Sequence, residues 1–226
     1  MANQQFTYVV DLVLCIDTTG SMSPIIDEVK ERATSFEADL RAALNSVGKE
    51  ISGLRARVVA YKDYLFDDEP ITQSPFFELP SESTEFREFV SKLTPAGGGD
   101  EPESGLEALA VAIRSKWSPV GAKNRQVICV WTDASAHALE KGRAESKTAY
   151  PADMPANIDE LTDLWEGQSS PMSAPAKRLL VFAPDSEMWN IVGQEWEQSI
   201  HIISQAGRGL EDHQLKAVLD TIANSI

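Results

Sequence analysis

The sequence predicts an α/β fold: a doubly wound, mostly parallel six-stranded sheet with one antiparallel edge strand and helices on both faces. Three observations support this prediction. Short runs of Val, Leu and Ile alternate with longer segments whose apolar residues recur at helical spacing. After residue 80 strands and helices alternate, which favours parallel pairing through right-handed crossovers. Two apolar runs end at or directly before an aspartate, and open α/β sheets bind ligands at such strand ends.

The elements follow from these patterns in chain order. The expected strands cover 9–17, 54–64, 71–79, 125–132, 178–183 and 199–203, and 71–79 is the antiparallel edge strand. The expected helices cover 25–47, 84–93, 106–117, 158–165 and 210–226. We expect the first and fourth strands side by side at the centre of the sheet. Their carboxyl ends would then bring Asp17 and Asp133 together.

The length suits a single domain over 1–226 with an insertion at 134–177. Between the strands 125–132 and 178–183 lie more than forty residues with four prolines, and a connection this long is uncommon unless it has a function. Within it Asn157 can cap a short helix. We interpret residues 134–172 as a partial lid or partner-docking surface beside the site. A decorative insertion packed on the side of the sheet is an equally good interpretation.

Composition limits the function. The chain has 226 residues and a net charge of −15, which argues against nucleic-acid binding because phosphate recognition needs a basic surface. Its apolar runs are too short to span a membrane and its start lacks a signal peptide, so we expect a cytoplasmic protein. We also expect a monomer. Cys15 and Cys129 both fall in apolar strands, where we expect inert core residues.

The first functional candidate is the turn after the strand 9–17. Asp17, Thr19 and Ser21 alternate along it, so three oxygen-bearing side chains can converge on one point. An all-oxygen ligand set suits a hard divalent cation, Mg²⁺ first, with Ca²⁺ or Mn²⁺ as alternatives. The alternative interpretation is that the hydroxyl groups cap the next helix and Asp17 hydrogen-bonds the turn.

Two further loops favour the metal. Residues 96–103 combine three glycines with acids ahead of a predicted helix, where the helix dipole favours negative charge. The strand 125–132 leads directly into Asp133. Taken singly, these loops are equally consistent with a flexible connector that has a capping Asp and with a strand-terminating Asp.

Together the three loops resemble a von Willebrand factor type A domain and its metal-ion-dependent adhesion site. Asp17, Thr19 and Ser21 match the first loop of that site, and Asp133 in a Thr-Asp-Ala context matches the third. The family usually places a metal-contacting Thr in the second loop, where this chain has Asp100. If Asp100 takes that role, three carboxylates face a doubly charged ion.

The resemblance implies a module that binds a protein partner at a metal site, and no enzymatic activity. The second loop and the segments 150–155 and 159–165 are closer to an intracellular bacterial branch, some of whose members accompany tellurite-resistance proteins. The alternative is a magnesium-dependent phosphohydrolase with a Rossmann-like fold. Such enzymes want an acid two residues after the nucleophile, and this chain has Thr19 there. We expect His137, four residues past Asp133, at the surface.

Overall fold

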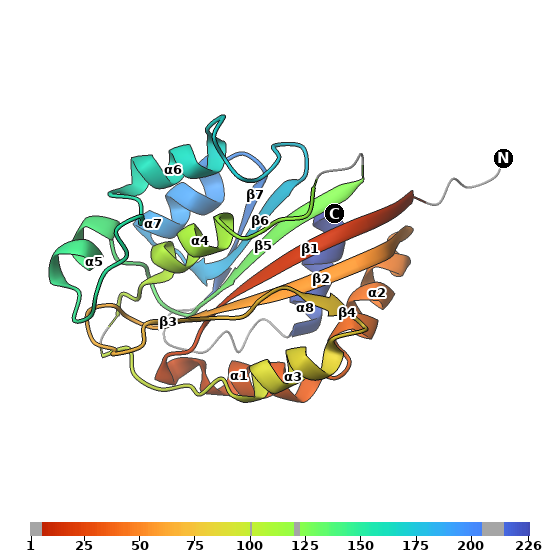
Figure 1. Cartoon of the computed structure of the whole chain (residues 1–226), viewed down its shortest axis with the longest axis horizontal. Helices are drawn as coiled ribbons and strands as arrows, with labels where there is room; N and C mark the ends of the chain where they lie inside the picture. Colours follow the sequence, from red (N-terminus) through yellow and green to blue (C-terminus); the bar gives the residue numbers. More distant parts are fainter. Residues whose placement is uncertain (1–5, 100, 120–122, 205–214) are drawn as a thin grey trace.

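The computed structural model describes residues 6–99, 101–119, 123–204 and 215–226 (Figure 1). The described residues form one sheet of seven strands in the order β3-β2-β1-β5-β6-β7, with β4 also paired to β2. The strands are β1 (Phe6–Asp17), β2 (Lys49–Tyr61), β3 (Ile71–Gln73), β4 (Phe77–Leu79), β5 (Asn124–Trp131), β6 (Lys177–Pro184) and β7 (Ser199–Ser204). β3 and β4 pair antiparallel with β2, and the other described pairs are parallel. β1 and β5 are neighbours, as predicted.

Helices cover both faces of the sheet. They are α1 (Ser23–Arg32), α2 (Phe36–Ser46), α3 (Ser83–Ser91), α4 (Gly105–Ile113), α5 (Leu139–Glu145), α6 (Ile158–Glu166), α7 (Glu187–Asn190) and α8 (Leu215–Ser225). Figure 1 shows α4, α6 and α7 over one face and α1, α2, α3 and α8 over the other. No helix in the described part of the chain is long and apolar enough to cross a bilayer.

The central strand β1 explains why the sheet has two cores. Leu12 and Leu14 join the core under α1, α2 and α8, whereas Val13 and Cys15 join the core under α4 and α6. All four are buried, as expected for a parallel strand covered on both faces. Cys15 is therefore an inert core residue, and burial raises the pKa of its thiol to about 12.

Several boundaries differ from the prediction; β2 begins and ends earlier than the expected 54–64, and α4 ends at Ile113 instead of 117. The helix expected over 25–47 is two helices, α1 and α2, separated by residues 33–35. The edge strand expected over 71–79 is split into β3 and β4, because Ser74 turns inward and its Oγ accepts a hydrogen bond from the backbone N–H of Val58 at 2.9 Å. In the helix expected over 210–226, α8 confirms the later part and residues 210–214 lie outside the described residues.

The segment between β5 and β6 packs against the body of the protein. Leu139, Leu161 and Trp165 are fully buried and belong to the core under α4. The Asn157 side chain caps α6 by accepting a hydrogen bond from the backbone N–H of Glu160 at 2.9 Å, as predicted. The segment begins at the end of β5, so its first residues lie beside the candidate site.

Candidate metal centre at the carboxyl edge of the sheet

The candidate site is built on the adjacent ends of β1 and β5. Ile16 is paired with Trp131, so Asp17 and Thr132 leave the sheet side by side. The Thr132 hydroxyl donates a 2.6 Å hydrogen bond to Oδ2 of Asp17. Its Oγ1 also accepts the backbone N–H of Ala134 at 3.0 Å, which turns the chain just after Asp133. Thr132 thus couples the two loops that carry the predicted aspartates.

The polar groups of the first loop hydrogen-bond one another and the third loop. The hydroxyl and backbone N–H of Thr19 both donate to Oδ1 of Asp17, at 2.6 and 2.8 Å. The Ser21 hydroxyl donates to Oδ1 of Asp133 at 2.9 Å. Four predicted site residues thus form two hydrogen-bonded pairs, Thr19 with Asp17 and Ser21 with Asp133, and Thr132 links the pairs through its bond to Asp17 and its place directly before Asp133. The fifth, Asp100, lies outside the described residues.

Ser21 is the part of this group that faces solvent. Its residue is exposed, whereas Asp17, Thr19 and Asp133 are at most 3% exposed. The carboxylates are therefore buried beneath the surface, and Ser21 is the exposed residue of the group.

The structure adds Glu103, whose orientation the sequence leaves open. Glu103 is 5% exposed, and its Oε2 is buried without a hydrogen-bond partner among the described atoms. Its backbone is fixed beside the third loop, because its N–H donates to the carbonyl of Ser135 at 2.9 Å and its carbonyl accepts the N–H of His137 at 2.9 Å.

Gly98 brings the second loop against the first. A Cβ at this position would lie 2.4 Å from Oε1 of Glu103 and 2.8 Å from Cγ2 of Thr19. Its φ of +93° also favours glycine over other residues. The glycines of this loop thus let Glu103 and Thr19 approach the same short stretch of backbone.

Burial and the negative charge of neighbouring carboxylates raise carboxyl pKa values at this edge of the sheet. Burial raises the pKa of Asp17 to about 6, against its hydrogen bonds from Thr132 and Thr19, and the charge of Asp133 adds to the rise. Burial also raises the pKa of Glu103 to about 10, with further contributions from the charges of Asp17, Asp63, Asp67 and Asp133. A site with this surplus of negative charge is suited to a cation.

The prediction for His137 is wrong: the residue is 3% exposed. Its Nε2 lies 3.4 Å from Oδ2 of Asp63, which is fully buried just after β2. Oδ1 of Asp63 accepts the Ser104 hydroxyl at 3.1 Å and the backbone N–H of Leu65 at 2.9 Å. The backbone N–H of His137 is hydrogen-bonded to the Glu103 carbonyl, which holds the third loop against the body of the protein. The imidazole is therefore buried beside the Asp63 carboxylate.

The donor set is made of carboxylate and hydroxyl oxygens. Within the described ranges, no three Asp, Glu, His or Cys side chains converge as a complete metal site by themselves. Hydroxyl groups of Thr19 and Ser21 and the unpartnered oxygen of Glu103 extend the pair Asp17 and Asp133. Such oxygens, together with water, are what Mg²⁺ takes as ligands.

Comparisons with known proteins place the chain in a family. A model of the von Willebrand factor A domain matches residues 11–146, a range that contains all three loops. The chain belongs to this family. Domains of the von Willebrand factor A family typically act as protein-interaction modules. The narrower likeness to an intracellular bacterial branch stays a prediction.

Two known proteins are similar to this chain, one in sequence and one in fold. The alpha-protein kinase vwkA of Dictyostelium discoideum is 29% identical over 159 residues, which are 69% of this chain and 23% of the kinase. The pilus adhesin SpaC of Lactobacillus rhamnosus GG superposes with a TM-score of 0.57 at 10% identity, over 96% of this chain and 30% of the adhesin; its open conformation gives 0.56. The adhesin shares the fold. This chain spans less than a third of either protein's length.

Sequence reasoning missed Thr132, and it left open whether Glu103 points inward. Thr132 stands in the Thr-Asp-Ala context of the third loop, so its place directly before Asp133 was a usable signal. Glu103 stands among Asp100 and Glu101 in one acidic run, and nothing in the residue types distinguishes them. Only the path of the glycine loop shows that Glu103 is buried while Glu101 is exposed and accepts the N–H of Ser135.

Proposed function

We propose that this domain binds a divalent cation at the carboxyl edge of its sheet and uses the occupied site to bind a partner protein. Asp17, Ser21 and Asp133 would hold the ion, and Thr19 would contribute its hydroxyl oxygen. The ion is Mg²⁺ in the first instance, with Ca²⁺ or Mn²⁺ as alternatives. A bound ion would supply positive charge and an open coordination position at the rim of the site.

One observation carries the proposal. Oε2 of Glu103 is buried without a hydrogen-bond partner among the described atoms, and burial, together with the charges of four other carboxylates, raises the pKa of Glu103. Unpaired buried polar atoms are costly, so such an atom calls for a partner absent from the protein itself. A cation among the oxygens of Asp17, Asp133 and Glu103 would be that partner. Glu103 is thus a second candidate for the role that we assign from the resemblance to Asp100.

The number of carboxylates at the site affects which kind of partner it can bind. If three carboxylates share one doubly charged ion, the site keeps no net positive charge. We therefore expect a partner to be bound mainly by the surface around the ion, and a single acidic residue of the partner to matter less than the rest of its contacts. The phosphohydrolase alternative gains no support, because Thr19 occupies the place of the required acid.

The test is a calorimetric titration of Mg²⁺ into chelator-stripped protein. We expect saturable binding that Asp133→Asn weakens at least about tenfold, since this change removes a charged ligand and keeps the side chain's size. Asp163→Asn, the same change at an exposed position on α6, is the matched control and should bind like the wild type. Glu103→Gln and Asp100→Asn then identify which second-loop acid contributes.

A wild-type chain that takes up no ion, or an Asp133→Asn variant that binds as well as the control, would contradict the metal site. Partner binding is tested with the same proteins. Proteins retained by the immobilised wild type in Mg²⁺ should be released by chelator and should not be retained by Asp133→Asn. Retention that is equal for Asp133→Asn and Asp163→Asn would mean that the partner binds independently of the site.

A further inference from the structure

A second site lies on the α4 face, away from the acidic edge. A hollow of about 450 Å³ is lined there by Arg55, Arg57, Ser74, Pro75, Phe76, Arg114 and Lys116. We call this hollow the basic pocket. Four of its seven lining residues are cationic and none is acidic, in a chain whose net charge is −15. Arg57 precedes Tyr61 at the end of β2 by four residues, or about 13 Å along the strand.

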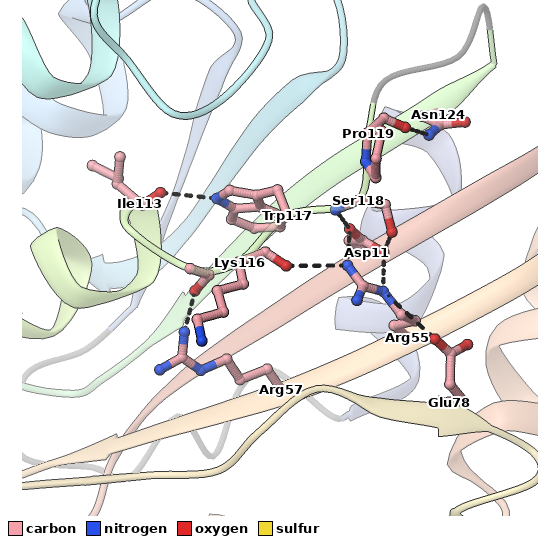
Figure 2. Close-up of polar contacts among 11 residues, drawn as sticks. Asp11, Arg55, Arg57, Glu78, Ile113, Lys116, Trp117, Ser118, Pro119 and Asn124 are labelled. Carbon is pink, nitrogen blue, oxygen red and sulfur yellow. Dashed lines mark hydrogen bonds and ion pairs between the residues drawn. The ribbon is translucent and has the colours of Figure 1, made fainter.

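Arg57 is the unusual member of the basic pocket. Its guanidinium donates to the carbonyl of Ser74 at 3.0 Å and to the hydroxyl of Ser115 at 2.7 Å, and it also contacts the side-chain oxygen of Gln73. All three acceptors are neutral. Figure 2 shows Arg57 reaching from β2 toward the segment after α4, beside Lys116. Burial lowers the pKa of Arg57, as expected for a partly buried cation that lacks a carboxylate partner.

The neighbouring charges do not neutralise Arg57. Asp11 is fully used: it accepts two hydrogen bonds from Arg55, at 2.9 and 2.6 Å, and two from Ser118, at 2.6 and 3.2 Å (Figure 2). In the part of the chain that the structure describes, no carboxylate lies within ion-pair distance of Arg57 or Lys116. The basic pocket therefore holds two cations without a counter-charge.

Helix electrostatics account for only part of this arrangement. Arg114 and Lys116 follow the carboxyl end of α4, where the helix dipole favours cations. Arg57 comes from the middle of a strand, where no helix dipole stabilises its charge. Arg114 lies 3.8 Å from Asp153, whose side chain is 79% exposed, so water screens that pair. A bound anion would give Arg57 the partner that the protein does not supply.

We propose that the basic pocket binds a phosphate group, carried either by free phosphate or by a small phosphomonoester. A phosphate carries up to two negative charges near neutral pH, which matches the two unpaired cations, whereas a carboxylate carries one. Arginine and lysine are the side chains that bind phosphate oxygens most often. The hollow falls within the size range of small-ligand pockets and exceeds a bare phosphate, so it has room for an organic group.

One wall of the basic pocket suits that organic group. Phe76 lies between Arg55, whose Cζ is 4.4 Å from the ring centroid, and Trp117, whose ring centroid is 5.7 Å away. This pairing fixes the Phe76 ring as an apolar wall beside the cations. The ligand class is therefore a phosphate ester with a small apolar or aromatic portion, or phosphate alone.

The test is a titration with inorganic phosphate and, separately, O-phosphoserine, followed by NMR at constant ionic strength in chelator. Chelator removes the cation site from the experiment. We expect saturable shifts with a dissociation constant of about 1 mM or tighter. Arg57→Gln and Lys116→Gln should each weaken binding at least about tenfold. Arg87→Gln is the matched control, because Arg87 is an exposed arginine on α3 that also contacts only neutral oxygens, and it should bind as the wild type does.

The titrations distinguish a phosphomonoester site, a free-phosphate site and the absence of a site. Tighter binding of O-phosphoserine assigns the pocket to a phosphomonoester, and equal binding assigns it to free phosphate. Binding that fails to saturate, or is equal in Lys116→Gln and Arg87→Gln, overturns the proposal. Lys116 is exposed, so its variant keeps the test valid if Arg57→Gln does not fold. Serine without phosphate should leave the spectrum unchanged.

Discussion

Glu107 is a buried carboxyl group outside the candidate metal centre. It lies in the first turn of α4 and is 0% exposed. One carboxylate oxygen accepts the Tyr150 hydroxyl at 2.9 Å, and the other has no partner among the described atoms. Burial raises its pKa from 4.5 to about 7, the Tyr150 hydrogen bond opposes the rise and the charge of Asp63 adds to it. Glu107 should therefore titrate near neutral pH.

This raised pKa makes stability depend on pH. Between pH 4.5 and about 7 the folded chain keeps a proton on Glu107 that the unfolded chain has released. The contribution to stability is complete below pH 4.5 and is lost as the pH rises through about 7, by about 3 kcal/mol in total. We expect Glu107→Gln to remove this part of the pH dependence, because the amide oxygen still accepts the Tyr150 hydroxyl and carries no charge.

The measurement is the free energy of unfolding by urea at several pH values between 4.5 and 8. Glu140→Gln, the same change at an exposed position on α5, is the control and should keep the wild-type slope. If Glu107→Gln and the control follow the same curve, Glu107 is ionised in the folded chain and its surroundings are more polar than the structure indicates.

At the scale of elements, the segment between β5 and β6 forms part of the α4 layer. Leu161 and Trp165 of α6 are 0% exposed, and the indole of Trp165 stacks on Trp196 with ring centroids 5.8 Å apart. The indole N–H of Trp165 also donates to the carbonyl of Glu197 at 3.0 Å. α6 is thus tied to both the core and the chain before β7, as a permanently packed helix would be.

We therefore expect Leu161→Ala to lower the free energy of unfolding by about 2–5 kcal/mol, the usual cost of a cavity at a fully buried leucine. Leu164→Ala, three residues on and only partly buried, should cost clearly less. Urea denaturation followed by circular dichroism measures both. If α6 opens independently as a lid, Leu161→Ala will instead leave the main unfolding transition unchanged.

The strand ends were the most predictable elements. A buried strand in a doubly wound sheet must be apolar on both faces, so β1 and β5 are visible as runs of Val, Leu and Ile that stop at a polar loop. The break between α1 and α2 was not visible, because the apolar spacing continues from Val29 through Ala33 to Phe36. Periodicity reports which face of a helix is buried, and a short interruption between two helices leaves that face unchanged.

At the scale of the whole molecule, the strand order makes only the strand-end part of the candidate site predictable from the sequence. Asp17 and Asp133 lie near each other because β1 and β5 are neighbours, and the crossover rules only reduce the number of strand orders to consider. Glu103 and His137 depend on loop paths, which are set by backbone contacts such as the bond from His137 N–H to the Glu103 carbonyl at 2.9 Å. Sequence patterns carry little information about such contacts.

Negative and positive charges gather at two different places in the molecule. Carboxylates gather at the end of the sheet, around Asp17, Asp133 and Glu103, and unpaired cations gather beside Arg57 on the α4 face. The net charge of −15 makes the first arrangement unsurprising and the second one informative. We assign a cation to the first place and a phosphate to the second, so the two sites can be tested independently.

We propose that a cation lies among Asp17, Ser21 and Asp133. The decisive experiment is anomalous diffraction from crystals soaked in Mn²⁺, which substitutes for Mg²⁺ and scatters anomalously. We expect one strong anomalous peak within ligand distance of these three side chains, absent from crystals of Asp133→Asn. A peak elsewhere in the molecule, or none at this edge in the wild type, would contradict it.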